Sequence, residues 1–229
     1  MSKQPEQSDD PRLHSSLRRH LQNAAFTTLY RFGGRIYDPL TQLLFGGAWG
    51  RWRRSIIAFL PQGSVLDLGC GTGSFVNELN AKGYVAFGID REPSMLRQAR
   101  TLTGTRKRLV RGDARILPFR AACFDACVAT FPSRFILQQR TLDEVVRVLR
   151  PGGVFAVVLS GDTNSWPLHR RPIRLVLQLV YGARESQRPP DASVIAHPAL
   201  TGEWRRLAQG SDRVLVWIGT RTETIETVP

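Results

Sequence analysis

The chain has 229 residues, 42% of them hydrophobic, and a formal net charge of +13. This length can bury one substantial core but leaves little for a second domain. The sequence has no apolar run of 18 residues or more and no signal peptide, which argues against a membrane-spanning or secreted protein, so we expect a cytoplasmic one. The three cysteines, an odd number without C-x2-C spacing, argue against a disulfide framework and against a zinc site.

The N-terminal segment is predicted to form a helical cap in front of the main domain. Residues 1–11 are polar and charged, and we expect them to be disordered. From Leu13 to Tyr30, apolar residues recur at three- and four-residue steps with basic residues on other faces, which predicts an amphipathic helix. We therefore expect a helical lid over residues 12–60 and a main domain over 61–229, with an insert at 160–200.

The segment VLDLGCGTGSF, Val65 to Phe75, predicts a ligand-binding turn. An apolar strand leads into three glycines at alternate positions and then into a helix. Glycines permit positive φ and a close approach of the backbone to a ligand, and a helix N-terminus offers free N–H groups. Asp67, just before the glycines, would repel a pyrophosphate. The turn therefore suits a ligand that carries positive charge.

Further strands and acids follow in an order that can complete such a site. An apolar strand at 84–89 ends in Asp90, where an acid can take both hydroxyls of a ribose. A short strand over 109–114 carries the next acid, Asp113. The remaining predicted elements are a buried strand at 123–130, a helix at 142–149 with an Arg-Pro-Gly-Gly turn behind it, a strand at 154–159 and a hairpin at 204–219.

These signatures in this order resemble the class I S-adenosylmethionine (SAM) dependent methyltransferases, in particular the methyltransferase type 11 and ubiquinone/menaquinone methyltransferases. The resemblance implies an α/β fold: a Rossmann-like seven-stranded sheet of order 3-2-1-4-5-7-6, with strand 7 antiparallel, helices on both faces and the N-terminal helical lid. It implies SAM as cofactor and S-adenosylhomocysteine as product. It also implies that Asp90 binds the ribose and that Asp113 accepts from the adenine amino group. The cofactor-binding residues expected from it are Asp67, Gly69, Cys70, Gly71, Gly73, Asp90, Arg91, Asp113, Ala114 and Thr130.

The acceptor side of the site is less well defined by the sequence. The segment YDPLTQLLFGG is similar to the one that closes over SAM and an apolar acceptor in those relatives, which makes Tyr37 either a site residue or an aromatic packed on the core. Methyl transfer needs a base only if the acceptor loses a proton, and the candidate bases are His169 and His197, with Tyr37 as a hydrogen-bonding group. Of these, we expect Tyr37 and His169 to be catalytic. No metal is expected.

The residues after the fourth predicted strand, Thr130-Phe131-Pro132-Ser133, lack the Asn or Asp and the second proline typical of enzymes that methylate base amino groups. Phe131 and Phe135 instead predict an apolar wall, or core anchors that shape the loop.

Three explanations compete for the arginine-rich, positively charged composition. Only three of the 32 basic residues are lysines, a bias that a GC-rich genome alone can produce. Arginines beside apolar helices suit an anionic membrane surface, which would make the protein peripheral at the inner membrane face. The charge also suits nucleic acid. We therefore expect methylation of an apolar or membrane-associated small molecule, quinone- or lipid-like, with an RNA methyltransferase or a non-catalytic SAM-binding regulator as alternatives.

Overall fold

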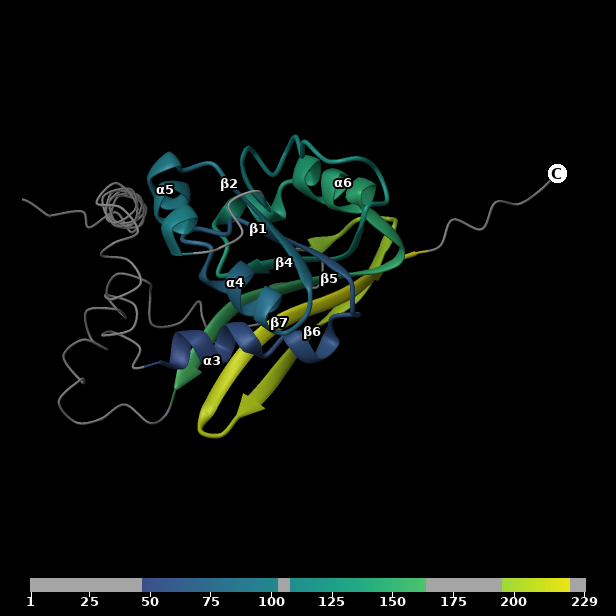
Figure 1. Cartoon of the computed structure of the whole chain (residues 1–229). Helices are drawn as coiled ribbons and strands as arrows, with labels where there is room; N and C mark the ends of the chain where they lie inside the picture. Colours follow the sequence, from purple (N-terminus) through teal and green to yellow (C-terminus); the bar gives the residue numbers. More distant parts are fainter. Residues whose placement is uncertain (1–46, 103–107, 164–194, 223–229) are drawn as a thin grey trace, which may run out of the picture.

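The computed structural model describes residues 47–102, 108–163 and 195–222 (Figure 1). The expected disordered segment 1–11, the amphipathic helix from Leu13 to Tyr30 and most of the 160–200 insert lie outside these residues, so the domain division stays a prediction.

Seven strands form one sheet in the order β3-β2-β1-β4-β5-β7-β6, as the resemblance implies. Strands β1 to β5 pair in parallel, whereas β7 runs antiparallel to both β5 and β6. The strands are β1 (Ser64–Leu68), β2 (Val85–Asp90), β3 (Leu109–Arg111), β4 (Phe124–Thr130), β5 (Leu149–Thr163), β6 (Leu200–Gln209) and β7 (Asp212–Arg221).

Helices cover both faces of the sheet and divide the core into two layers. The helices are α3 (Ala48–Arg54), η1 (Ile57–Phe59), α4 (Ser74–Ala81), α5 (Pro93–Leu102), η3 (Arg134–Leu137) and α6 (Gln139–Val148). One layer packs α3, α4 and α5 on the sheet, and the other packs η3 and α6 on the opposite side (Figure 1). Neighbouring residues of β1 divide between the layers, Val65 into the first and Leu66 into the second. This alternation explains the continuous apolar runs of the central strands.

Three predicted boundaries were wrong by several residues. Strand β3 ends at Arg111 rather than 114, because Asp113 enters a turn and bridges to Ile116. Helix α6 begins at Gln139, three residues before its first apolar contact residue. Strand β5 spans Leu149–Thr163 rather than 154–159, because Leu149 already pairs with Phe124 and the strand's far end pairs with β7. No described helix is long and apolar enough to cross a membrane.

Candidate cofactor and acceptor site

The glycine turn between β1 and α4 has the backbone form that its sequence predicts. Gly69, Gly71 and Gly73 have φ of 74°, 54° and 70°, in the region that favours glycine. The N–H groups of Gly69 and Cys70 donate to the Ile89 carbonyl at 2.8 and 3.1 Å, which ties the turn to the end of β2. A Cβ built on Gly71 would meet no atom within 4 Å among the described residues, so space lies beside the turn there.

Asp90 lies against this turn, as the spacing predicts. Its Oδ2 accepts a hydrogen bond from the Gly71 N–H at 2.8 Å, and its Oδ1 accepts from the Glu92 N–H at 2.8 Å. Burial raises the pKa of Asp90, while the hydrogen bonds from Glu92 and Gly71 oppose that rise. The carboxylate is therefore fixed beside the open space at Gly71, where it can accept further hydrogen bonds.

Asp67 is a buried acid at the start of the turn. Its side chain is 1% exposed, and its Oδ1 has no hydrogen-bond partner in the part of the chain that the structure describes. Burial raises the pKa of Asp67 to about 7; the charge of Arg53 lowers it and that of Asp90 raises it further. An unpaired buried carboxylate is costly unless a cation or a proton satisfies it. This oxygen is suited to a ligand ammonium group.

Cys70 contributes packing as well as backbone to the turn. It is buried, and a Cβ on Gly88 would come within 2.7 Å of its Sγ. Burial, with the charges of Asp67 and Asp90, raises the thiol pKa, which keeps Cys70 neutral. Both observations favour packing over reactivity.

The loop after β3 holds the third predicted acid in an ion-pair cluster. Asp113 accepts from Arg115 through Nε at 2.9 Å and Nη2 at 2.5 Å, and the Nη1 of Arg91 lies 3.9 Å away. The Arg115 side-chain hydrogen bond lowers the pKa of Asp113 to about 2. An adenine amino group would share this carboxylate with Arg115. Arg91 is mostly exposed and Ala114 is buried.

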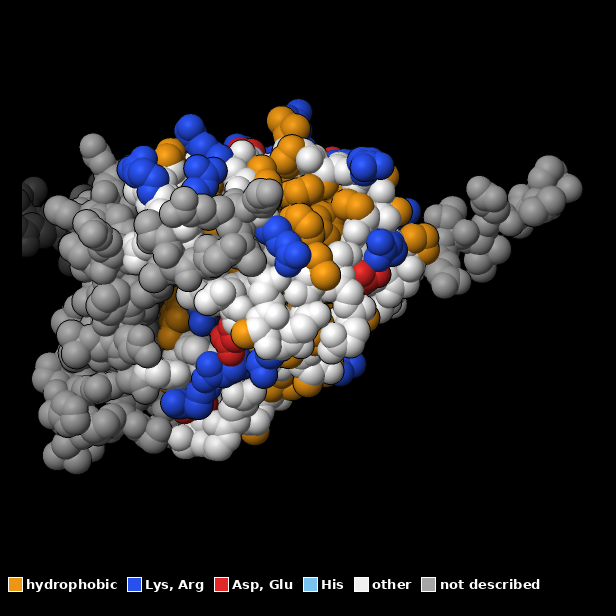
Figure 2. Space-filling view, viewed as in Figure 1, with side chains coloured by type: hydrophobic (Ala, Val, Ile, Leu, Met, Phe, Trp, Pro, Cys, Tyr) orange, Lys and Arg blue, Asp and Glu red, His pale blue; other side chains and the backbone are white. Residues whose placement is uncertain are grey.

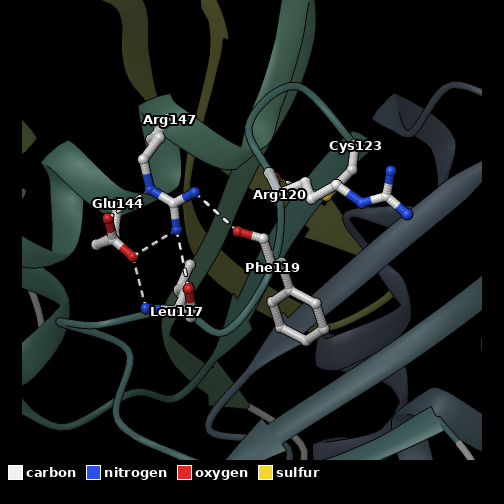
Figure 3. Close-up of polar contacts among 6 residues, drawn as sticks. All are labelled: Leu117, Phe119, Arg120, Cys123, Glu144 and Arg147. Atoms are coloured by element: carbon white, nitrogen blue, oxygen red, sulfur yellow. Dashed lines mark hydrogen bonds and ion pairs between the residues drawn. The ribbon is translucent and has the colours of Figure 1, made fainter.

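Two residues of α6 hold the backbone of that loop in a clamp that we did not predict from the sequence (Figure 3). Arg147 donates to the carbonyls of Leu117 at 2.9 Å and Phe119 at 2.8 Å, and pairs with Glu144 through Nε at 2.6 Å and Nη2 at 2.8 Å. The Glu144 Oε2 accepts from the Leu117 N–H at 2.5 Å. The available signal was the E-x-x-R spacing on a helix, which places both side chains on one face.

Aromatic rings gather at the carboxyl end of β4, directly after Thr130. Phe131 has φ of 50°, a conformation uncommon outside glycine that often marks functional positions. Its ring stacks on Trp49 of α3, with centroids 3.7 Å apart and planes at 25°. Phe135 lies against the turn, since a Cβ on Gly69 would meet its ring at 3.3 Å. Phe131 and Phe135 both pack partly on the core, which fits the expectation that they anchor the loop, whereas their role as an acceptor wall stays a prediction.

The candidate bases are not joined to this site by the structure. Tyr37 and His169 lie outside the described residues. His197 accepts from the Ala199 N–H through Nδ1 at 3.0 Å and approaches Asp143 of α6 through Nε2 at 3.3 Å. Both ring nitrogens of His197 are therefore engaged in contacts that fix the chain before β6.

The site chemistry fits SAM. The turn offers bare backbone beside open space, Asp90 offers a fixed acceptor, and Asp67 has an unsatisfied buried oxygen suited to an ammonium group. These groups lie at or next to the carboxyl ends of β1 and β2, where ligands bind in open α/β sheets.

The chain is similar to known methyltransferases. A family model described as a methyltransferase domain matches residues 66–157. A demethylmenaquinone methyltransferase from Mycolicibacterium paratuberculosis is 33% identical over 197 residues, covering 82% of this chain and 83% of the relative. One from Thermus thermophilus is 37% identical over 131 residues, covering 53% of this chain and 60% of the relative. The chain spans only 52%, 60% and 61% of the length of three such relatives.

The fold is shared with solved methyltransferases. A SAM-dependent methyltransferase from Thermotoga maritima, described as a possible histamine N-methyltransferase, superposes with a TM-score of 0.58 at 18% identity, covering 86% of this chain and 99% of that one. At this identity the likeness concerns the fold alone. Together with the family match and the relative covered over most of its length, it leads to one assignment: the chain belongs to the class I SAM-dependent methyltransferases, and its cofactor is SAM.

Proposed function

We propose that this protein is an enzyme that transfers the methyl group of SAM to an apolar, ring-containing acceptor of the quinone type. The observation that carries the proposal is the stack of Trp49 on Phe131 at the carboxyl end of β4. The stack offers a flat apolar surface just after β4, and Phe135 lies against the glycine turn at Gly69. A planar aromatic acceptor suits such a surface, because aromatic faces pack by offset stacking and burial of area.

The chain's own residues would do little covalent chemistry. When bound, SAM would supply a methyl group carried on a positively charged sulfur. A nucleophile of the acceptor can bond to this methyl carbon while the carbon–sulfur bond breaks. Asp90 would hold the ribose, Asp67 the ammonium group, and Asp113 with Ala114 the adenine. Held in this way, the methyl group faces the acceptor at a fixed position, and positioning of this kind can supply most of the rate. If the acceptor is a ring carbon or hydroxyl that loses a proton, His169 is the proposed base and Tyr37 a proposed hydrogen-bonding group.

The names of the relatives support the acceptor class. Several are demethylmenaquinone methyltransferases, the matched segments being 33% to 37% identical to this chain. A prenylated quinone is held by lipid, and Figure 2 shows many Lys and Arg side chains and few acidic ones around a hydrophobic patch on the visible face. A basic surface of this kind would favour an anionic membrane. We therefore propose a peripheral association at the inner membrane face.

The test is a methyl-transfer assay with labelled SAM and the purified full chain. The acceptors are a reduced naphthoquinone with a free ring position and a short prenyl tail, a phospholipid and an unmodified RNA. Label in the naphthoquinol, with none in the other two, supports the proposal. Transfer to RNA or phospholipid alone overturns the acceptor class, and cofactor binding without transfer to any of them supports a regulator.

Variants of Trp49 test the stacked wall directly. Trp49→Ala should raise the KM for the quinol about tenfold or more while leaving the Kd of S-adenosylhomocysteine unchanged, because only the acceptor loses its stacking surface. Trp49→Phe, which keeps a ring on Phe131, is the matched control and should stay close to wild type. Equal KM values in all three proteins would show that the acceptor binds elsewhere.

A further inference from the structure

The loop between β3 and β4 holds Ile116 in a fixed place. The Ile116 N–H donates to the Asp113 carbonyl at 3.0 Å, which closes a turn before it. Directly after it, the clamp from α6 holds Leu117 by both backbone groups: Glu144 accepts from its N–H at 2.5 Å, and Arg147 donates to its carbonyl at 2.9 Å. The backbone on both sides of Ile116 is therefore tied down by hydrogen bonds.

This fixed backbone presents Ile116 to solvent. Its side chain is 75% exposed, whereas the neighbouring Leu117 is 4% exposed. Val85, at 42%, is the other exposed large hydrophobic residue in the part of the chain that the structure describes, and it begins β2 at the opposite end of the parallel strands. A single exposed hydrophobic residue is common on protein surfaces. The residues around Ile116 must therefore decide whether it has a partner.

The exposed surface around Ile116 is apolar or cationic. From the end of β3 to the start of β4, the exposed residues are Arg111, Ile116, Pro118, Arg120, Ala121 and Ala122. The one acid of this stretch, Asp113, is only partly exposed and pairs with Arg115 at 2.5 Å. Arg111 and Arg120 have no acidic partner among the described residues, and the Arg120 guanidinium points away from the clamp (Figure 3). Their charges are therefore available to a ligand.

Helix α5 extends this positive charge along the same edge of the sheet, because it packs on the edge strand β3. Residues 91–102 and 108–122 together contain seven arginines and two acids, a net charge of +5. Figure 2 shows Lys and Arg side chains over α5, and others around a hydrophobic patch on the same face. The loop thus joins an exposed aliphatic side chain to a cationic edge.

The combination of an aliphatic tip and unpaired arginines favours a lipid surface over RNA. At an anionic bilayer, an apolar side chain enters the boundary between headgroups and acyl chains while nearby cations attract the headgroups. Single-stranded RNA is instead bound by aromatic rings on which its bases stack. The aromatic residue of this loop, Phe119, already packs edge-on against Phe124, with ring centroids 5.1 Å apart.

We propose that the loop after β3 is the membrane-contacting surface of the protein, with Ile116 inserted into the lipid boundary and Arg111 and Arg120 on anionic headgroups. The inference rests on the proposed peripheral membrane association and names the surface that makes it. Strands β1 to β4 run parallel, so this loop and Phe131 leave the same edge of the sheet, three strand spacings of about 4.8 Å apart. A bilayer at this edge lies on the side from which a lipid-held acceptor would enter.

The experiment is co-sedimentation of the full chain at low salt with vesicles of phosphatidylglycerol mixed with phosphatidylcholine. Ile116→Ser should lower the partition coefficient about tenfold, because it removes the apolar side chain that enters the lipid. Arg111→Gln and Arg120→Gln should each lower it about fivefold, and Ile116→Leu should bind as wild type does.

The matched controls make the same changes elsewhere on the surface. Val85→Ser removes an exposed aliphatic side chain at the amino end of β2, and Arg213→Gln removes an exposed arginine of β7, beyond β5 from the β3 edge. Both should partition as wild type does. Losses equal to those of Ile116→Ser and Arg120→Gln would show that binding depends on general charge and hydrophobicity, which refutes the assigned surface.

Two further measurements distinguish the membrane contact from the fold and the cofactor site. Ile116→Ser should leave the thermal unfolding midpoint and the Kd of S-adenosylhomocysteine unchanged. A raised Kd with unchanged vesicle binding would place Ile116 in the cofactor site and overturn the proposal. Weaker binding of an unmodified RNA by Arg111→Gln and Arg120→Gln, with unchanged vesicle binding, would assign these cations to nucleic acid instead.

The vesicle results also separate this inference from the proposed function on which it rests. If wild type binds the anionic vesicles and all three loop variants bind equally well, the membrane contact lies elsewhere and only the assigned surface is wrong. If wild type does not bind them even at low salt, the peripheral association itself is wrong, and the assigned surface falls with it.

Discussion

Arg147→Gln should damage both the stability of the protein and its affinity for the cofactor. The substitution removes two hydrogen bonds to the Leu117 and Phe119 carbonyls and two to Glu144, and leaves the Glu144 carboxylate without its cation. Hydrogen bonds to charged groups contribute about 1.5 to 3 kcal/mol each when buried. Arg147 is 37% exposed, so water can replace part of them, and we expect a loss of about 2 kcal/mol in the free energy of unfolding.

The loss of affinity follows from the loop that the clamp holds. Leu117 lies four residues after Asp113, so a loosened loop no longer presents Asp113 and Ala114 at a fixed position, and the Kd of S-adenosylhomocysteine should rise about three- to tenfold. Urea unfolding and calorimetry measure the two effects. Arg147→Lys should recover little, because an ammonium group cannot span both carbonyls and Glu144 as the guanidinium fork does.

A double-mutant cycle decides whether the clamp acts through Asp113. If it does, Arg147→Gln should cost less affinity in an Asp113→Ala background than in wild type. Full additivity, or an affinity of Arg147→Gln equal to wild type below its unfolding transition, would refute this reasoning and leave the clamp as a stability feature alone.

Three further outcomes follow from the same structure. Asp90→Ala should raise the Kd of SAM at least about tenfold in calorimetry, because it removes charge-assisted hydrogen bonds that contribute about 1.5 to 3 kcal/mol to binding. An unchanged affinity in the folded variant would show that Asp90 does not bind the ribose. Gly161→Ala should lower the free energy of unfolding by about 1 to 3 kcal/mol, since its Cβ would overlap the Trp52 ring; a urea midpoint equal to wild type would contradict this. Binding to anionic vesicles in co-sedimentation should fall steeply as salt rises from low values to above 0.1 M, while neutral vesicles bind little; equal binding to both would exclude an electrostatic membrane contact.

The sheet and the glycine turn could be predicted because their signals are local. The run from Val65 to Phe75 encodes a strand, a turn and a helix in adjacent residues, and Asp90 follows at the end of the next strand. In a parallel sheet the ends of neighbouring strands meet at one edge, so chain order alone brings the Asp90 carboxylate to the Gly71 N–H. The element boundaries were less predictable, because β5 is extended at both ends by pairing with distant strands.

The clamp on the loop after β3 could not be predicted from the sequence pattern of helix α6 alone. Glu144 and Arg147 look like an ordinary exposed ion pair on an amphipathic helix, and such pairs contribute little by themselves. Their importance comes from two backbone carbonyls some thirty residues earlier in the chain, which only the tertiary structure brings within hydrogen-bonding distance. A polar pair beside a loop that lacks regular structure is where such a role should be sought.

The contacts of helix α3 likewise depend on distant parts of the chain. From the sequence we expect residues 12–60 to form a helical lid. In the structure, Trp49 stacks on Phe131, Trp52 donates to Asp212 and Arg53 reaches Ser74, and these three partners lie in distant parts of the chain. Each contact serves a different element, so the effects should divide by residue: acceptor KM for Trp49 and stability for Trp52. A lid that merely covers the core would show no such division.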